Sequence, residues 1–122
     1  MSKYHNKKVS FNGEIFDSKR ELITYVKLLN YKQQGLIKDL KRQVPFILIP
    51  KQYETQIVNI RGKPKEKKVL LEQEVKYIAD FTFYRTSDNM FCVVDSKGVK
   101  TKEYIIKRKL MLYIHHIKVI ED

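Results

Sequence analysis

The residues whose types and spacing best suit metal binding and catalysis are two aspartates and a lysine, Asp80, Asp95 and Lys97. Asp80 stands in the apolar run 77–81, and Asp95 follows the apolar run 91–94. Ionised carboxylates inside apolar strands are costly unless they are paired or bind a metal. A hard cation such as Mg²⁺ takes one or two carboxylates and leaves positions for water and a substrate phosphate. The alternative is that both aspartates are surface residues with Lys97 as their ion-pair partner.

The segment 81–94 is typical of a β-hairpin, because aromatic and β-branched residues flank a turn-forming cluster at 86–89. If the turn centres on the middle of that cluster, Asp80 and Asp95 lie directly opposite each other, with Cβ atoms about 5 Å apart. Lys97 follows two residues after Asp95 and so lies on the same face. The predicted hairpin therefore gathers two carboxylates and one ammonium at its open end.

A chain of 122 residues is long enough for one domain with a core and too short for two. The hydrophobic content of 43% and the charged content of 32% are typical of a soluble globular protein. No apolar run approaches the roughly 20 residues of a membrane span, and the first residues lack the apolar core of a signal peptide, so we expect a cytoplasmic location. The single cysteine, Cys92, excludes an internal disulfide framework and a multi-cysteine zinc site.

The net charge of +11 and the isoelectric point near 9.7 indicate a polyanionic partner, most simply nucleic acid. Charge alone does not choose between DNA and RNA, and a ribosome-associated or membrane-surface protein is also compatible with it. We expect phosphate contacts from the basic tip of a ribbon at 61–68 and from a basic helix that begins at residue 102. The alternative for the tip is a solvated, flexible loop. The candidate nucleic-acid-binding residues are Arg61, Lys63, Lys65, Lys67, Lys68, Lys102, Lys107 and Lys109.

The remaining periodicities predict an α/β fold with a central mixed β-sheet and two flanking helices in a single domain, 1–122. The elements that we expect, in chain order, are a mobile basic arm at 1–8, a small β-hairpin at 9–16, a helix at 19–34, a strand at 36–49, an inserted basic ribbon at about 51–76, the hairpin described above, a helix from 102 and a strand at 117–120.

Glu21 lies in the first turn of the first predicted helix, three residues after Ser18. This S-x-x-E spacing is that of a capping box, which accounts for Glu21 without any chemistry. A glutamate in a first helical turn can also face the open end of the hairpin, so the two roles are compatible.

Five short motifs occur in a fixed order along nearly the whole chain. They are Phe16-Asp17-Ser18-Lys19-Arg20-Glu21, Leu40-Lys41-Arg42-Gln43, Ala79-Asp80-Phe81, Asp95-Ser96-Lys97-Gly98 and Thr101-Lys102-Glu103-Tyr104. Each motif is weak by itself, but the ordered set resembles the PD-(D/E)XK nuclease superfamily, in particular its small phage and prophage proteins. Ala79 stands where the name of the superfamily has proline, a position that varies.

The resemblance implies a restriction-endonuclease-like core and a metal-dependent DNA endonuclease that acts on phage replication, recombination or packaging intermediates. It implies Asp80, Asp95 and Glu21 as ligands of Mg²⁺, for which Mn²⁺ could substitute, Lys97 as the catalytic lysine and Gln43 as an accessory residue. No small-molecule cofactor is expected. The alternatives are a structure-selective resolvase of Holliday junctions, which would act as a homodimer, a catalytically silent nucleic-acid-binding domain, and an RNA-binding accessory protein.

Overall fold

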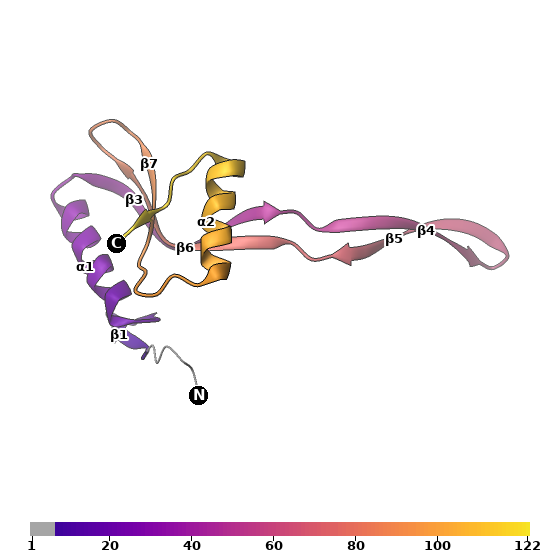
Figure 1. Ribbon diagram of the computed structural model, residues 1–122, viewed down its shortest axis with the longest axis horizontal. Helices are drawn as coiled ribbons and strands as arrows, with labels where there is room; N and C mark the ends of the chain where they lie inside the picture. The colour runs from indigo at the N-terminus through magenta and orange to yellow at the C-terminus, as the bar shows by residue number, and fades with distance from the viewer. Residues whose placement is uncertain (1–6) are drawn as a thin grey trace.

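A four-stranded mixed sheet lies between two helices in the computed structural model, which describes residues 7–122 (Figure 1). The elements are β1 (Val9–Phe11), β2 (Glu14–Phe16), α1 (Lys19–Gln33), β3 (Ile37–Ile49), β4 (Gln52–Ile60), β5 (Lys63–Glu72), β6 (Val75–Arg85), β7 (Phe91–Asp95), α2 (Lys102–His115) and β8 (Ile120–Glu121). Residues 1–6 of the expected basic arm lie outside the described residues. The expected α/β class, with a mixed sheet and two helices, is confirmed.

The sheet has the strand order β3-β6-β7-β8, in which β6 is antiparallel to both β3 and β7, whereas β8 is parallel to β7. The β6–β7 hairpin pairs Phe81 with Val94 and Tyr84 with Phe91, so its turn centres between residues 87 and 88 as predicted. The last strand is shorter than the predicted segment 117–120 and begins only at Ile120.

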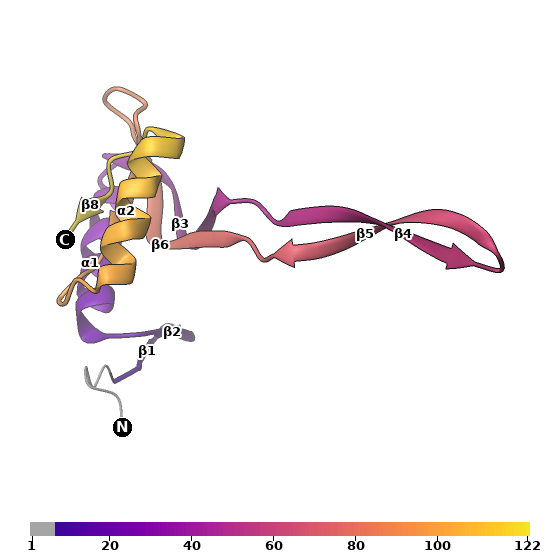
Figure 2. The ribbon, with the colours of Figure 1, turned by 45° about the vertical axis from the view of Figure 1, so that its right-hand side comes forward.

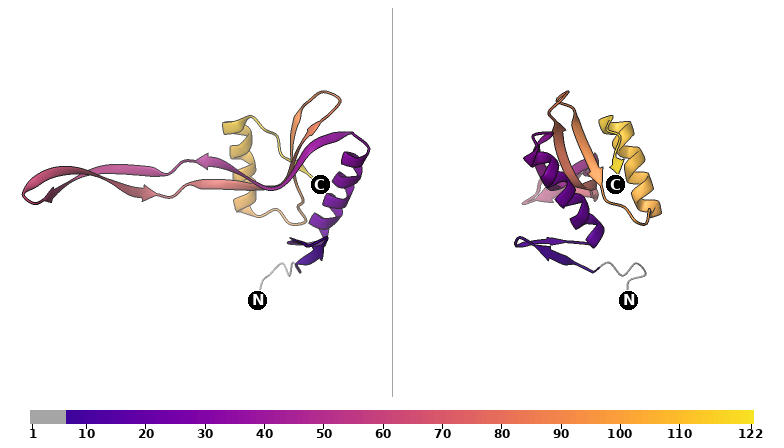
Figure 3. Two further views of the ribbon diagram at one scale, coloured as in Figure 1. Left: turned by 180° about the vertical axis from the view of Figure 1, so that it is seen from behind. Right: turned by 90° about the vertical axis from the view of Figure 1, so that its left-hand side faces the viewer.

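The two helices cover opposite faces of the sheet, which Figure 3 shows in its right-hand view. Tyr77 and Ala79 of β6 belong to the buried cluster that contains Tyr104 and Met111 of α2. Phe81 and Phe83 belong to the other cluster, together with Leu28 of α1. Residues two apart on a strand normally share a face, so β6 passes from one cluster to the other at residue 80. Asp80 therefore lies at the junction of the two halves of the core.

Both helices begin at residues whose hydroxyl groups cap them. The Glu21 amide donates to Ser18 Oγ over 3.2 Å, and the Tyr104 amide donates to Thr101 Oγ1 over 3.1 Å. Each bond satisfies one of the free N–H groups that a helix start leaves. The local sequence thus fixes where both helices begin. The two helix starts lie at the end of the molecule where the candidate site residues converge.

A long two-stranded ribbon formed by β4 and β5 extends away from the sheet (Figures 1 and 2). Its register pairs Gln56 with Lys67 and Glu54 with Val69, which differs from the predicted pairing of 56–60 with 69–72. The expected eight-residue basic tip is also wrong. The turn consists only of Arg61 and Gly62, which both have positive φ (54° and 77°), as a tight hairpin turn requires. The lysines lie along β5 instead.

The described part of the chain, residues 7–122, contains no helix with the length and apolar character needed to cross a membrane.

Because the core lies in the sheet and not in the ribbon, a substitution in the sheet should lower the free energy of unfolding far more than one in the ribbon. Phe81→Ala should lower the free energy of unfolding by about 3–5 kcal/mol, because Phe81 is fully buried and the change leaves a cavity. Ile57→Ala on the ribbon should change it by less than about 0.5 kcal/mol, since Ile57 is 67% exposed. Urea unfolding of both variants checks this. Equal effects would contradict the division into a core and an exposed ribbon.

Candidate active site

Asp80 and Asp95 face each other across β6 and β7. The pairing of Phe81 with Val94, continued by one residue, places Asp80 opposite Asp95. Asp80 Oδ2 accepts a hydrogen bond from the Ser96 amide (2.9 Å), and Asp95 Oδ2 accepts one from the Tyr77 hydroxyl (2.5 Å). Asp95 is only 1% exposed, and its Oδ1 atom is buried without a hydrogen-bond partner. One oxygen of the pair thus lacks the partner that buried polar atoms normally have.

Burial and its acidic neighbours raise the pKa of Asp80 to about 8. Desolvation is the main cause, followed by the proximity and the charge of the Asp95 carboxyl group, with a smaller effect of Glu21. The hydrogen bond from the Ser96 amide opposes the shift. Burial, with Asp95 beside it, also raises the pKa of Tyr77, so its hydroxyl stays a neutral donor. Two carboxyl groups this close share a proton or need a cation between them.

Lys97 supplies a positive charge beside the carboxylates. Its Nζ atom lies 3.6 Å from Asp95 Oδ1 and 4.8 Å from the centre of the Tyr104 ring. The ring face favours a cation. Burial above all raises the pKa of Tyr104, which keeps its hydroxyl neutral. Asp95 and Lys97 both line a pocket of about 340 Å³ between β6 and the start of α2. The ammonium group and Asp95 therefore both border a space that a ligand could enter.

Glu21 is joined to Asp80 through Gln43. The Gln43 Nε2 atom donates to Glu21 Oε1 over 2.9 Å and lies 3.5 Å from Asp80 Oδ1. Glu21 is 2% exposed, and its second oxygen accepts a hydrogen bond from the Asp17 amide (2.9 Å). The Glu21 carboxylate thus both tethers the start of α1 and faces the candidate site, which are the two roles that the sequence predicted for it.

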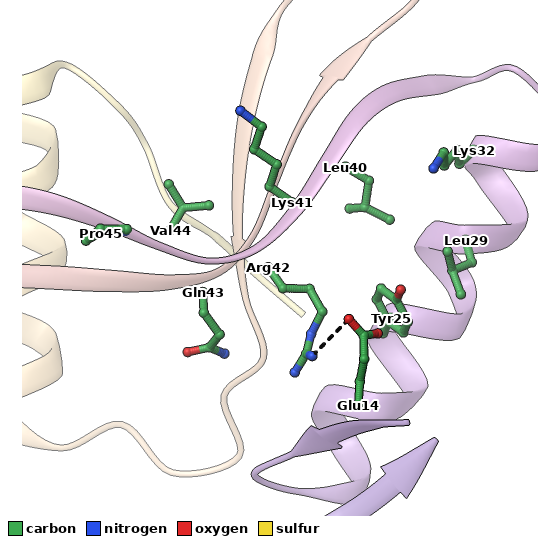
Figure 4. A pocket seen from close by; sticks show the side chains of 10 residues that line it. All are labelled: Glu14, Tyr25, Leu29, Lys32, Leu40, Lys41, Arg42, Gln43, Val44 and Pro45. Carbon is green, nitrogen blue, oxygen red and sulfur yellow. Dashed lines mark ion pairs between the residues drawn. The ribbon is translucent and has the colours of Figure 1, made fainter. Parts of the chain in front are cut away.

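Gln43 reaches both carboxylates because the backbone of β3 is irregular there. Its φ of 54° is uncommon for a residue with a side chain. The neighbouring pairs Arg42–Phe81 and Val44–Ala79 place Gln43 opposite Asp80. Arg42 and Gln43 point to the same side of β3, against the usual alternation (Figure 4). Strained residues of this kind cluster at functional sites, where they re-aim a side chain.

Arg42 connects the site with the N-terminal hairpin. Its guanidinium group lies 3.5 Å from Glu21 Oε1, donates to the Ile15 carbonyl over 3.0 Å and lies 3.6 Å from Glu14 Oε1 (Figure 4). It also stacks on the Phe16 ring at 3.8 Å. Arg42 therefore holds the β1–β2 hairpin against the acidic end of the sheet.

Sequence reasoning missed Arg42, Tyr77 and Tyr104 as parts of this site. The position of Arg42 next to Gln43 was a signal that could have found it. Nothing in local spacing pointed to Tyr77, because residues 77 and 80 normally lie on opposite faces of a strand. Their contact with one carboxylate pair depends on the course of β6 near Asp80.

The basic residues predicted to bind nucleic acid lie at different distances from the carboxylates. Lys107 lines the same pocket as Asp95 and Lys97 and pairs with Glu103 at 3.0 Å. Lys102 and Lys109 are exposed and seven residues apart, so they share the face of α2 that points away from the sheet. The predicted residues 61–68 lie on the ribbon. The structure thus brings only Lys107 of this set to the site.

The donor set fits Mg²⁺ better than a metal that needs a full protein cage. Within residues 7–122, no three His, Cys, Asp or Glu side chains are arranged as a ready metal-ligand group. Two facing carboxylates, one of them with a buried oxygen that accepts no hydrogen bond from the described residues, match a cation that takes one or two carboxylates and completes its shell with water and phosphate. Asp80 and Asp95 would hold it. The role of Glu21 as a third ligand stays a prediction, since Glu21 contacts Asp80 through Gln43.

The raised pKa of Asp80 predicts how stability depends on pH in the absence of metal. Between its ordinary value of 3.8 and about 8, the unfolded chain loses the Asp80 proton and the folded chain keeps it. The folded state then binds more protons, so stability falls as pH rises, by at most about 1.4 kcal/mol per pH unit. Asp80→Asn should flatten this decline and stabilise the protein at neutral pH.

Urea unfolding between pH 5 and pH 8 in EDTA measures the effect. Asp39→Asn is the matched control, because Asp39 is exposed and its positive φ suits asparagine. If the wild type and Asp80→Asn decline with equal slopes, Asp80 does not hold a proton in the folded state.

Comparison with known proteins places the chain in a family. No curated protein and no solved structure matches the chain significantly. Residues 1–120 match the family described as Protein of unknown function (DUF1064). Because this match spans nearly the whole sequence, the chain belongs to the DUF1064 family.

Proposed function

We propose that the protein is a Mg²⁺-dependent DNA endonuclease with a restriction-endonuclease-like core. The observation that carries the proposal is the buried pair of carboxyl groups: Asp80 lies opposite Asp95, the Lys97 ammonium is 3.6 Å from Asp95 Oδ1, and this oxygen has no hydrogen-bond partner within residues 7–122. Buried polar atoms normally have a hydrogen-bond partner, so a buried carboxylate oxygen that lacks one is a candidate ligand of a cation. The resemblance of the ordered motifs to PD-(D/E)XK nucleases supports the same reading.

Each residue of the site has a task in hydrolysis of a phosphodiester. When bound, Mg²⁺ supplies positive charge at the phosphate and lowers the pKa of water. Asp80 and Asp95 hold the cation, and Tyr77 fixes the orientation of Asp95 through its hydroxyl group. Lys97 places a compact positive charge where the scissile phosphate enters the pocket and stabilises the additional negative charge of the transition state. Gln43 fixes Asp80 relative to Glu21.

The charge around the pocket suits an anionic polymer. Lys76, Lys97 and Lys107 line it together with Asp95 and Glu103, and the net charge of the chain is +11. Contacts of lysine with phosphate position a nucleic acid without reading its sequence. This arrangement favours a nuclease with broad sequence tolerance.

Substitution of the site should abolish cleavage and preserve binding. Asp95→Ala and Lys97→Ala should each lower the rate of Mg²⁺-dependent nicking of supercoiled plasmid by at least about 100-fold. DNA binding of Asp95→Ala should persist or tighten, because a negative charge near phosphate is lost. Asp88→Asn is the matched control, since Asp88 is an exposed aspartate at the far turn of the same hairpin and pairs only with Arg85 and the Met90 amide.

A wild-type protein that binds DNA with no cleavage in Mg²⁺ or Mn²⁺ would overturn the proposal in favour of a silent binding domain. Cleavage restricted to four-way junctions would favour the resolvase.

The Tyr77 hydroxyl should affect cleavage by raising the affinity of the site for Mg²⁺. Tyr77→Phe removes the donor to Asp95 Oδ2, and loss of such an outer contact typically weakens metal affinity or activity about 10–100-fold. We expect the Mg²⁺ concentration for half-maximal cleavage to rise, with a smaller Mg²⁺-induced increase in Tm. Tyr113→Phe is the control, because Tyr113 is 81% exposed. An unchanged Mg²⁺ requirement would show that Tyr77 does not orient a metal ligand.

A further inference from the structure

The β4–β5 ribbon has the properties of an arm that binds a partner. It runs away from the globular part of the molecule along the longest axis (Figures 1 and 2). Val58 and Val69 are its only half-buried residues, and the rest of both strands is exposed. An isolated two-stranded ribbon is marginally stable in water. The length of this ribbon is therefore explained by a surface that it lies against.

The ribbon carries a regular row of positive charge. Lys63, Lys65 and Lys67 alternate along β5 and so share one face, opposite Ile60, Val58 and Gln56 of β4. Side chains two residues apart on a strand are about 7 Å apart. Each strand of B-DNA carries one phosphate per roughly 3.4 Å of axis. The row of lysines thus presents positive charge along the length of a phosphate backbone that lies alongside.

The ribbon suits a duplex better than a single strand. Proteins that bind single strands stack the bases on aromatic side chains. Tyr53 is the only aromatic residue of β4 and β5, and Lys68 lies over its ring at 4.5 Å. A straight, twisted ribbon is matched instead by a stiff rod, and the major groove is about 12 Å wide and admits two strands.

The same charge disfavours a second copy of this chain on the ribbon. Lysines on exposed strands are a known device against pairing between sheet edges. Residues 61–68 hold one arginine and four lysines against one glutamate, so two ribbons side by side would repel each other.

We propose that the ribbon lies along duplex DNA on one side of the scissile phosphate, so that the substrate must continue as duplex on that side. The chain between Lys67 and Asp80 spans roughly 40 Å at about 3.3 Å per residue, which equals roughly 12 base pairs of B-DNA. The contact with duplex rests on the ribbon alone. The position of the scissile phosphate rests on the proposed function.

Binding in EDTA tests the ribbon independently of cleavage. We would measure fluorescence anisotropy of the wild type with blunt duplexes of roughly 8, 16 and 24 base pairs, lengths that bracket the reach of the arm at 3.4 Å per pair. Affinity should rise at least 10-fold from the shortest to the longest duplex. Replacement of Lys63, Lys65, Lys67 and Lys68 by serine should remove most of that gain. It should also reduce the slope of log affinity against log salt by about three.

The control variant carries the same change in charge elsewhere. Lys32, Lys38, Lys41 and Lys118 are exposed residues outside the ribbon, and their replacement by serine should leave the dependence on length as in the wild type. Equal length dependence in the ribbon variant and the wild type would overturn the inference. So would a dimer, seen by light scattering, that the ribbon substitutions dissociate.

Cleavage gives the second readout. On an end-labelled duplex with Mg²⁺, cuts should stay roughly 12 base pairs or more from one end and approach the other freely. Cuts equally close to both ends would overturn the one-sided placement and leave the proposed endonuclease intact. Length-dependent binding without any cleavage would support the ribbon as a duplex-binding arm and refute the endonuclease.

Discussion

The mutual repulsion of two buried carboxyl groups is the constraint on which the rest of the site depends. Asp80 and Asp95 lie opposite each other between two halves of a hydrophobic core, where ionised groups are poorly solvated. Three neighbouring groups stabilise the two carboxyl groups, namely the Ser96 amide, the Tyr77 hydroxyl and the Lys97 ammonium. Within the described residues, Asp95 Oδ1 still has no hydrogen-bond partner and is compensated only by the Lys97 charge at 3.6 Å. A fold that needed only stability would gain by replacing this pair with apolar residues, which is why we assign it a task.

Two irregularities of the backbone lie in the same row as the carboxylates. Gln43, Asp80 and Asp95 occupy successive positions across β3, β6 and β7. Gln43 has a strained positive φ, and at Asp80 the strand passes from one buried cluster to the other. These departures from regular strands direct Arg42 and Gln43 together at Glu21. The sheet therefore acts as the frame that brings α1, β3, β6 and β7 to one point, where Gln43 holds a strained backbone.

The molecule combines two kinds of stability. The sheet and its helices are held by buried aromatic and aliphatic side chains, which make the site rigid. The ribbon has almost no buried surface and is held by its strand pairing and its tight turn at Arg61 and Gly62. This division suits the proposed function, in which the rigid sheet holds the catalytic residues and the ribbon lies along the DNA. The arm can adjust without disturbing the carboxylates, because no core residue belongs to it.

The sequence by itself determined the class of fold, the starts of both helices and the register that sets Asp80 against Asp95. These follow from local signals, since capping residues, turn residues and the two-residue period act over a few positions. The tertiary structure alone decided that Tyr77 and Arg42 join the site, that Glu21 meets Asp80 through Gln43, and that the lysines of 63–68 lie along a strand. Each of these depends on backbone geometry at Gln43, Asp80 or Gly62. Such geometry results from packing between distant segments, which no local pattern records.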